Sequence, residues 1–186
     1  GIIDYHIWIF DRWGNMVSLV HSVFSVYGSR ATVGPYGFVL HNRGSAFSLD
    51  PKHPNVVAPR KRPFHSIIAG FVMKDGEPLM AFGNMGGSVQ PETHAQHMVN
   101  VIDHGMNVQM TTDAARFTHN QNSNMLSLEH NLFALVGKAL EAKGHKVRAV
   151  DGGAVGGYQG ILFTRDPRLP APVFDRTSVT EDRPVN

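Results

Sequence analysis

The alternation of apolar and polar residues predicts antiparallel hairpins in the first half of the chain. Residues 5–10 and 16–21 are rich in β-branched and aromatic side chains and are separated by a segment containing Gly-Asn. Residues 66–73 and 79–82 have the same character and flank an Asp-Gly pair, a typical hairpin turn. We therefore expect two β-hairpins.

The second half carries helical periodicity. In residues 91–104 apolar side chains recur at spacings of three and four, with proline in the first turn and glycine after the last. This predicts an amphipathic helix. Further helices are expected near 112–116 and over 131–143, and further strands over 38–41, 125–128, 145–150 and 160–163. A long structured loop is expected over 42–63. Hairpins segregated from helices predict a layered α+β sandwich.

Composition narrows the class of protein. The 186 residues are 42% hydrophobic and 17% charged, as in one soluble globular domain, here 1–186 with a polar tail over 164–186. The net charge of +2 gives no reason to expect a nucleic-acid partner, and no apolar run reaches the roughly 18 residues of a membrane helix. The absence of cysteine excludes disulfides and thiolate chemistry. The cellular compartment stays open.

Two adjacent glycines, Gly86 and Gly87, lie where a predicted strand meets a predicted helix. Two backbone N–H groups without side chains could point at a developing oxyanion. The alternative is a tight turn whose glycines only permit the backbone angles. The local pattern by itself favours the turn.

Eleven histidines raise the question of a metal site. His94, His97 and His104 share one predicted helix, but the chain has no HExxH pattern. We therefore expect exposed or half-buried histidines at a layer edge, and neither a metal nor a cofactor. The glycine-rich segment 152–160 lacks the Lys-Ser or Lys-Thr that follows a phosphate loop, which favours close backbone packing there.

A series of short motifs, each weak alone, occurs in a distinctive order between residues 4 and 163. They are Asp11-Arg-Trp-Gly-Asn15, Asn42-Arg43, Phe47-Ser-Leu-Asp50, His53-Pro-Asn55, Ala58-Pro59, Lys61-Arg-Pro63, Gly86-Gly87, Asp113-Ala-Ala-Arg-Phe117, Gly144-His145 and Gly156-Gly-Tyr-Gln159. Together they resemble the small subunit of γ-glutamyltransferases, also called glutathione hydrolases.

The resemblance implies a fold, a partner and a reaction. The family's fold is the four-layer αββα sandwich of N-terminal nucleophile hydrolases, of which this chain would supply one half. Its members are precursors that cut themselves into a large and a small subunit. They transfer or hydrolyse the γ-glutamyl group of glutathione and related amides through an acyl-enzyme. The implied partners are the large-subunit half and a small-molecule amide.

The resemblance also implies roles for individual residues. Gly86 and Gly87 match the pair whose amides form the oxyanion hole. Ser22 matches a hydroxyl near the nucleophile, where it would assist proton movement.

Other positions match the family's substrate-binding segments. His65 and Ser66 occupy a segment whose hydroxyls touch the γ-glutamyl carboxylate in relatives, and only Ser66 keeps one. Arg43 falls where relatives receive the α-amino group, and a cation there would repel an ammonium. Ala46 stands near where relatives place an acidic residue.

The main departure is at the nucleophile. Counting back from Asp11, the family's catalytic threonine should fall at position 4, which is Asp4, and no Ser, Thr or Cys precedes Ser18. An aspartate cannot perform the N-to-O acyl shift that frees the catalytic amine. Loss of such a nucleophile costs on the order of a millionfold in turnover.

Three hypotheses follow. The chain belongs to an active γ-glutamyltransferase-like protein, to a catalytically degenerate homologue that binds or stabilises a partner, or to an acylase acting on a non-glutamyl amide. An engineered substitution, a fragment boundary or an alignment slip at Asp4 is a further alternative. The start at Gly1, three residues ahead of the expected cut, argues against ordinary self-cleavage as the origin of this terminus.

Overall fold

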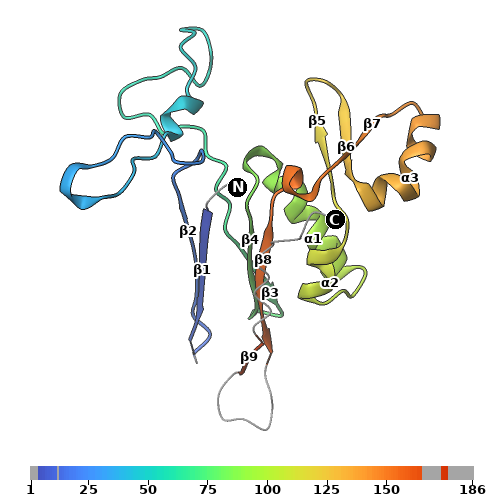
Figure 1. Cartoon of the computed structure of the whole chain (residues 1–186). Helices are drawn as coiled ribbons and strands as arrows, with labels where there is room; N and C mark the ends of the chain where they lie inside the picture. Colours follow the sequence, from blue (N-terminus) through green and yellow to red (C-terminus); the bar gives the residue numbers. More distant parts are fainter. Residues whose placement is uncertain (1–3, 12, 165–172, 176–186) are drawn as a thin grey trace.

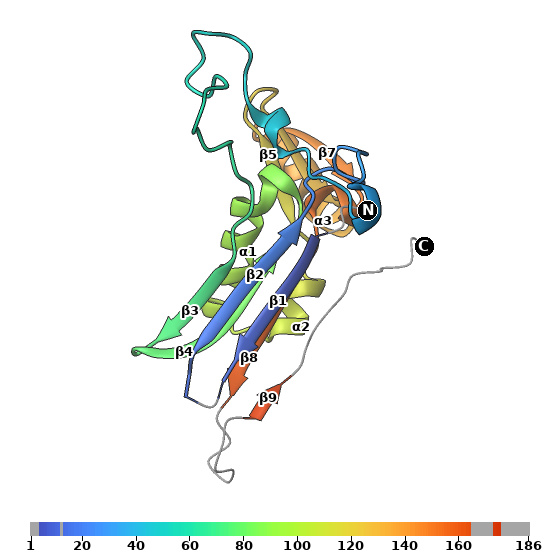
Figure 2. The same ribbon diagram turned by 90° about the vertical axis from the view of Figure 1, so that its left-hand side faces the viewer.

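Three stacked layers organise most of the molecule (Figures 1 and 2). The computed structural model describes residues 4–11, 13–164 and 173–175. One layer is the antiparallel hairpin of β1 and β2, the next is a four-stranded sheet in the order β3-β4-β8-β9, and helices α1 and α2 cover the far face of that sheet. The bounds are β1 Asp4–Phe10, β2 Met16–Ser22, β3 Gly70–Lys74, β4 Glu77–Asn84, β8 Tyr158–Thr164, β9 Val173–Asp175, α1 Gln90–Ile102 and α2 Val108–Asp113.

Alternation along β4 explains how the layers pack. Met80 and Phe82 join Val108 and Tyr158 in a core between the sheet and the helices. Ala81, on the opposite face, joins a second core with Phe10 and Phe163 between the sheet and the hairpin.

Close packing of hairpin on sheet depends on a glycine in β4. A side chain at Gly83 would run into the ring of His6, with Trp8 next to it. His6, Trp8 and Phe10 alternate with Ile7 and Ile9, which are exposed. One face of the hairpin therefore covers the sheet, and the other presents apolar side chains outward.

A second unit lies beyond α1 and α2. Strands β5 Phe117–Asn120, β6 Met125–Glu129 and β7 Lys146–Val150 form a small mixed sheet in which β5 and β6 are antiparallel and β6 and β7 are parallel. Helix α3, His130–Ala142, makes the crossover between the parallel strands.

The expected α+β architecture is confirmed, with differences at several elements. Residues 38–41 contribute only an isolated bridge from Val39 to Thr32, and β3 begins four residues later than expected. Helix α2 lies earlier than expected, and β5 and β9 were not predicted. Of the tail over 164–186, only its first residue and β9 are described, and the rest lies outside the described residues.

No helix in the described ranges is long and apolar enough to cross a membrane.

Candidate active-site pocket

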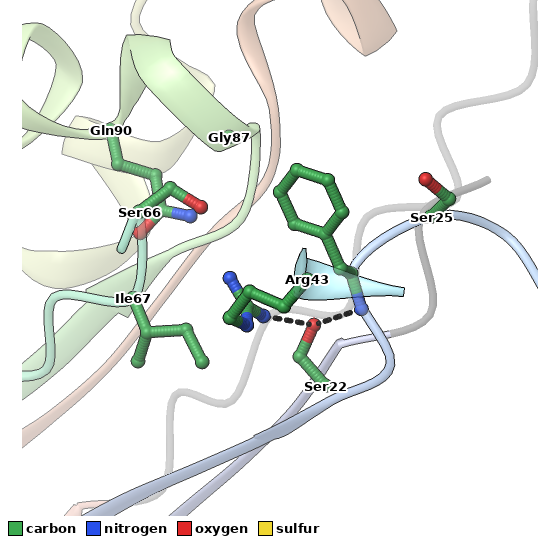
Figure 3. A pocket seen from close by; sticks show the side chains of 8 residues that line it. Ser22, Ser25, Arg43, Ser66, Ile67, Gly87 and Gln90 are labelled. Carbon is green, nitrogen blue, oxygen red and sulfur yellow. Dashed lines mark hydrogen bonds between the residues drawn. The ribbon is translucent and has the colours of Figure 1, made fainter. Parts of the chain in front are cut away.

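A cavity of about 290 Å³ opens where the end of β2 meets the start of α1. This volume is near the lower end of the range for small-molecule sites, roughly 300–1,000 Å³. Segments far apart in the sequence form its wall (Figure 3). The lining residues are Ser22, Phe24, Ser25, Arg43, Ser66, Ile67, Gly87 and Gln90.

The glycine loop before α1 reaches the wall of this cavity at Gly87. Gly86 has a φ of 137° and Gly87 a φ of 64°, values that side chains strongly disfavour. A Cβ at Gly87 would meet nothing within 4 Å, so this residue borders open space. A Cβ at Gly86 would meet Gly156 and Val89.

Two contacts hold the loop in place from behind. The backbone N–H of Met85 donates to the carbonyl of Gly157 at 2.8 Å, and a Cβ at Gly156 would overlap the carbonyl oxygen of Met85. The Asn84 amide donates to the Met85 carbonyl at 2.6 Å. The expected close backbone packing of the glycine-rich segment is therefore confirmed, and it buttresses the Gly86-Gly87 turn.

Arg43 supplies the charge of the cavity. Its side chain extends from the short helix Arg43–Ala46, and only 5% of the residue is exposed. Nη2 donates to Ser22 Oγ at 3.2 Å, and the guanidinium carbon lies 4.9 Å from the ring centre of Phe24. Nη1 is buried without a hydrogen-bond partner in the described part of the chain.

Ser22 contacts the Arg43 guanidinium and pairs with the first described residue of β1. Its Oγ accepts hydrogen bonds from the Phe24 backbone N–H at 3.0 Å and from Arg43. In the antiparallel register of the hairpin, Ser22 stands directly opposite Asp4. Position 4 therefore lies across the hairpin from a residue that lines the same cavity as Gly87.

Comparison with known proteins agrees with this geometry. The family model described as Gamma-glutamyltranspeptidase matches residues 5–181. The chain belongs to the gamma-glutamyltranspeptidase family. The glutathione hydrolase proenzyme of Escherichia coli is 34% identical over 188 residues, covering 93% of this chain and 32% of the relative.

Solved structures show the same fold. A gamma-glutamyltranspeptidase from Helicobacter pylori superimposes with a TM-score of 0.82 at 29% identity, covering 93% of this chain and 97% of that chain. Cephalosporin acylase from Bacillus halodurans gives a TM-score of 0.73 at 39% identity, covering 86% of this chain and 29% of that chain.

The fold is thus the α+β fold of the gamma-glutamyltranspeptidases, which are N-terminal nucleophile hydrolases, and this chain forms part of it. The chain spans 21% and 32% of the lengths of two curated relatives, both proenzymes. Relatives of the chain include glutathione hydrolases and acylases.

The structure brings together four of the seven expected site residues at the cavity wall: Ser22, Arg43, Ser66 and Gly87. Gly86 lies behind Gly87 against Gly156, and Asp4 stands opposite Ser22 in the hairpin. His65 is exposed and is not among the lining residues. The functional roles of all seven remain predictions.

Four lining residues were not anticipated from the sequence: Phe24, Ser25, Ile67 and Gln90. Gln90 carried a usable signal, because it is the first residue of the helix that follows the glycine pair. Phe24 and Ser25 carried none, since their position depends on a chain turn in which Phe24 has a φ of 75°.

Of the three histidines expected on this helix, only His97 differs from the expectation in its burial. His97 is completely buried and stacks on Tyr158 at a centroid distance of 3.7 Å, because it faces the sheet rather than a layer edge. Burial lowers the pKa of His97 to about 3, with smaller contributions from Arg116 and His94. Burial also lowers the pKa of the half-buried His94 to about 4. His104, by contrast, is exposed beyond the end of the helix.

In the described part of the chain, no group of three His, Asp or Glu side chains is arranged to hold a metal ion.

Proposed function

We propose that this chain forms the acyl-binding half of a γ-glutamyltransferase-like protein that binds a small amide but does not turn it over. The pocket would receive the carbonyl end of the amide at the backbone N–H groups of the Gly86-Gly87 turn. The observation that carries the proposal is the cavity itself, which Gly87 shares with Ser22, the residue opposite position 4 in the hairpin.

The glycine turn supports amide binding because it is preorganised. Gly156 and the Asn84 amide hold it from behind, so its N–H groups need no rearrangement when a carbonyl oxygen arrives. Donors fixed in this way stabilise a developing oxyanion far better than mobile ones do.

The absence of turnover follows from Asp4. In acyl transfer, a hydroxyl or thiol adds to the amide carbonyl, the C–N bond breaks, and the leaving amine takes a proton from the catalytic base. A carboxylate at position 4 offers no such hydroxyl, and residues 1–17 contain no Ser, Thr or Cys. The oxyanion donors alone would leave only residual activity.

The outward face of the hairpin supports a large-subunit partner. Ile7 pairs with Leu19 and Ile9 with Val17, and these four exposed side chains form an apolar stripe. Since the relatives are proenzymes several times longer than this chain, we infer that the other half of the precursor covers this stripe.

The partner can be tested by copurification with that other half. Leu19→Asp should abolish copurification, because it places a carboxylate within the apolar stripe. Leu135→Asp is the matched control, since Leu135 is exposed on α3. Equal losses in both variants would contradict the proposed interface.

The function is tested with the chain coexpressed with its upstream half. With γ-glutamyl-p-nitroanilide as substrate, the unaltered protein should release p-nitroaniline far more slowly than an active family member does. A small acyl amide should nevertheless shift the backbone amide resonance of Gly87, while that of Gly144, beyond α3, stays unchanged. Turnover would overturn the degenerate assignment, and an unperturbed Gly87 would overturn amide binding.

A further inference from the structure

The guanidinium of Arg43 has an unused donor group in the cavity. Ser22 takes one of its nitrogens, Nη2, whereas Nη1 is buried and has no hydrogen-bond partner in the described ranges. Figure 3 shows the guanidinium lying between Ser22 on one side and Ser66 and Gly87 on the other. A buried charged donor without a partner is costly, and a bound acceptor would remove that cost.

The electrostatics of the cavity favour an anion. Arg43 is the one charged side chain among its described lining residues, and none of them is acidic. Arginine stays protonated in proteins. An ammonium group in this cavity would therefore meet a buried positive charge, and none of the residues that line the cavity would offer it a carboxylate.

We propose that Arg43 makes this pocket select acyl groups that end in a carboxylate and carry no ammonium. An amide with such an acyl group is the monoamide of a dicarboxylic acid rather than a γ-glutamyl amide. The inference rests on the amide-binding function proposed above and specifies the substrate class of the same site.

The surroundings of Arg43 hold its guanidinium ready for this role. The hydrogen bond to Ser22 and the stacking of Phe24 limit its rotation, so a carboxylate would meet a prepared donor. The Ser66 hydroxyl and the buried Gln90 amide offer further polar groups at the wall. Ile67 and Phe24 provide apolar surface for the methylene groups between the two ends of such a ligand.

Three amides of the same chain length separate the possibilities. Glutaramate carries an amide and a carboxylate, L-glutamine adds an α-ammonium to that structure, and pentanamide replaces the carboxylate of glutaramate by a methyl group. Their affinities can be measured by saturation-transfer NMR on the chain coexpressed with its upstream half. We expect glutaramate to bind roughly 10- to 100-fold more tightly than either of the other two, the range of one hydrogen bond to a charged group.

Variants assign the preference to Arg43. Arg43→Gln should reduce the preference for glutaramate over pentanamide to within about twofold, and Arg43→Lys should keep part of it, because the charge remains while the fork geometry is lost. Lys138→Gln is the charge-matched control on the exposed side of α3 and should leave the preference unchanged. Circular dichroism checks that each variant is folded.

The outcomes separate this inference from the function on which it rests. If all three amides bind and L-glutamine matches or exceeds glutaramate, the selectivity is wrong and amide binding stands. If none binds, amide binding itself fails. If Arg43→Gln misfolds, the three affinities of the unaltered protein still decide, because they require no substitution.

Discussion

The imidazole of His97 stacks on the phenol ring of Tyr158 with a centroid separation of 3.7 Å and an interplanar angle of 31°. Both side chains are completely buried between the sheet and α1. The Tyr158 hydroxyl donates to Met80 Sδ at 3.6 Å, and His97 Nδ1 lies 3.4 Å from the Thr111 hydroxyl. A charged imidazole would be poorly solvated there, which is why its pKa is low.

Stability should therefore fall on acidification. The folded-state pKa values of about 3 for His97 and about 4 for His94 lie below the unfolded value of 6.5. Between about pH 6.5 and pH 4 the unfolded chain binds more protons, so the free energy of unfolding decreases as the pH falls. Each fully coupled proton contributes up to about 1.4 kcal/mol per pH unit, and the half-buried His94 contributes less than His97. Above pH 6.5 these two histidines should not make the free energy of unfolding depend on pH.

Urea unfolding at several pH values measures this dependence. His97→Gln should flatten the curve below pH 6.5, whereas His104→Gln, at an exposed position, should not change its slope. The same slope in His97→Gln as in the unaltered protein would contradict the assignment to His97.

A second prediction concerns the support of the glycine turn. Gly156→Ala places a methyl group against the Met85 carbonyl at a residue whose φ is 76°. It should lower the free energy of unfolding by more than about 1 kcal/mol and shift the amide resonance of Gly87, because both conformation and space exclude a side chain.

Gly153→Ala is its control in the same segment. A Cβ there meets nothing within 4 Å. Unfolding curves that coincide for the two variants would mean that Gly156 does not hold the turn.

A third prediction concerns the buried ion pair between Arg116 and Glu129. Glu129 accepts from the Arg116 backbone N–H at 2.6 Å and from its guanidinium at 3.1 Å, and neither residue is more than 4% exposed. Glu129→Gln should lower the free energy of unfolding by about 3–5 kcal/mol, because the buried guanidinium loses the negative charge of Glu129. Chemical denaturation measures the loss.

Glu141→Gln, at an exposed position of α3, is the matched control and should change stability by less than about 0.5 kcal/mol. A loss of similar size in both variants would show that the ion pair contributes little to stability.

The sequence predicted elements well where local periodicity coincided with packing. The two strands of the first hairpin and helix α3 differ from their expected bounds by at most one residue at each end. In the second hairpin, Asp75 and Gly76 have positive φ values of 54° and 81°, as a two-residue hairpin turn of the expected type requires. These features depend on neighbours within a few residues.

The sequence predicted less of the structure where contacts between distant segments determine it. Strand β5 is only four residues long and exists because it pairs with β6, and β9 because it pairs with β8. The full burial of His97 depends on Tyr158, 61 positions later in the chain. Likewise, the cavity joins Ser22, Ser66 and Gly87, and only the family resemblance suggested that they would meet.

The last prediction concerns Asp4, which stands in the hairpin opposite Ser22, a residue that lines the cavity. In the full-length precursor, Asp4→Thr should restore self-cleavage. The new hydroxyl adds to the preceding carbonyl and the C–N bond breaks, so that the acyl group moves from nitrogen to oxygen and the threonine amine is freed as a base. Water then hydrolyses the ester, which restores the hydroxyl and separates the two chains. Two bands on a denaturing gel, with a mass that begins at residue 4, measure this outcome.

Asp4→Ala is the control that distinguishes the effect of gaining a hydroxyl from the effect of losing the carboxylate, since it removes the charge without supplying a nucleophile. It should leave the precursor uncut. An uncut Asp4→Thr precursor that is folded would mean either that position 4 is not the nucleophile position or that the cavity lacks another group that self-cleavage needs. Adding Gly156→Ala to Asp4→Thr should slow the cleavage, because the turn that receives the oxyanion is then displaced.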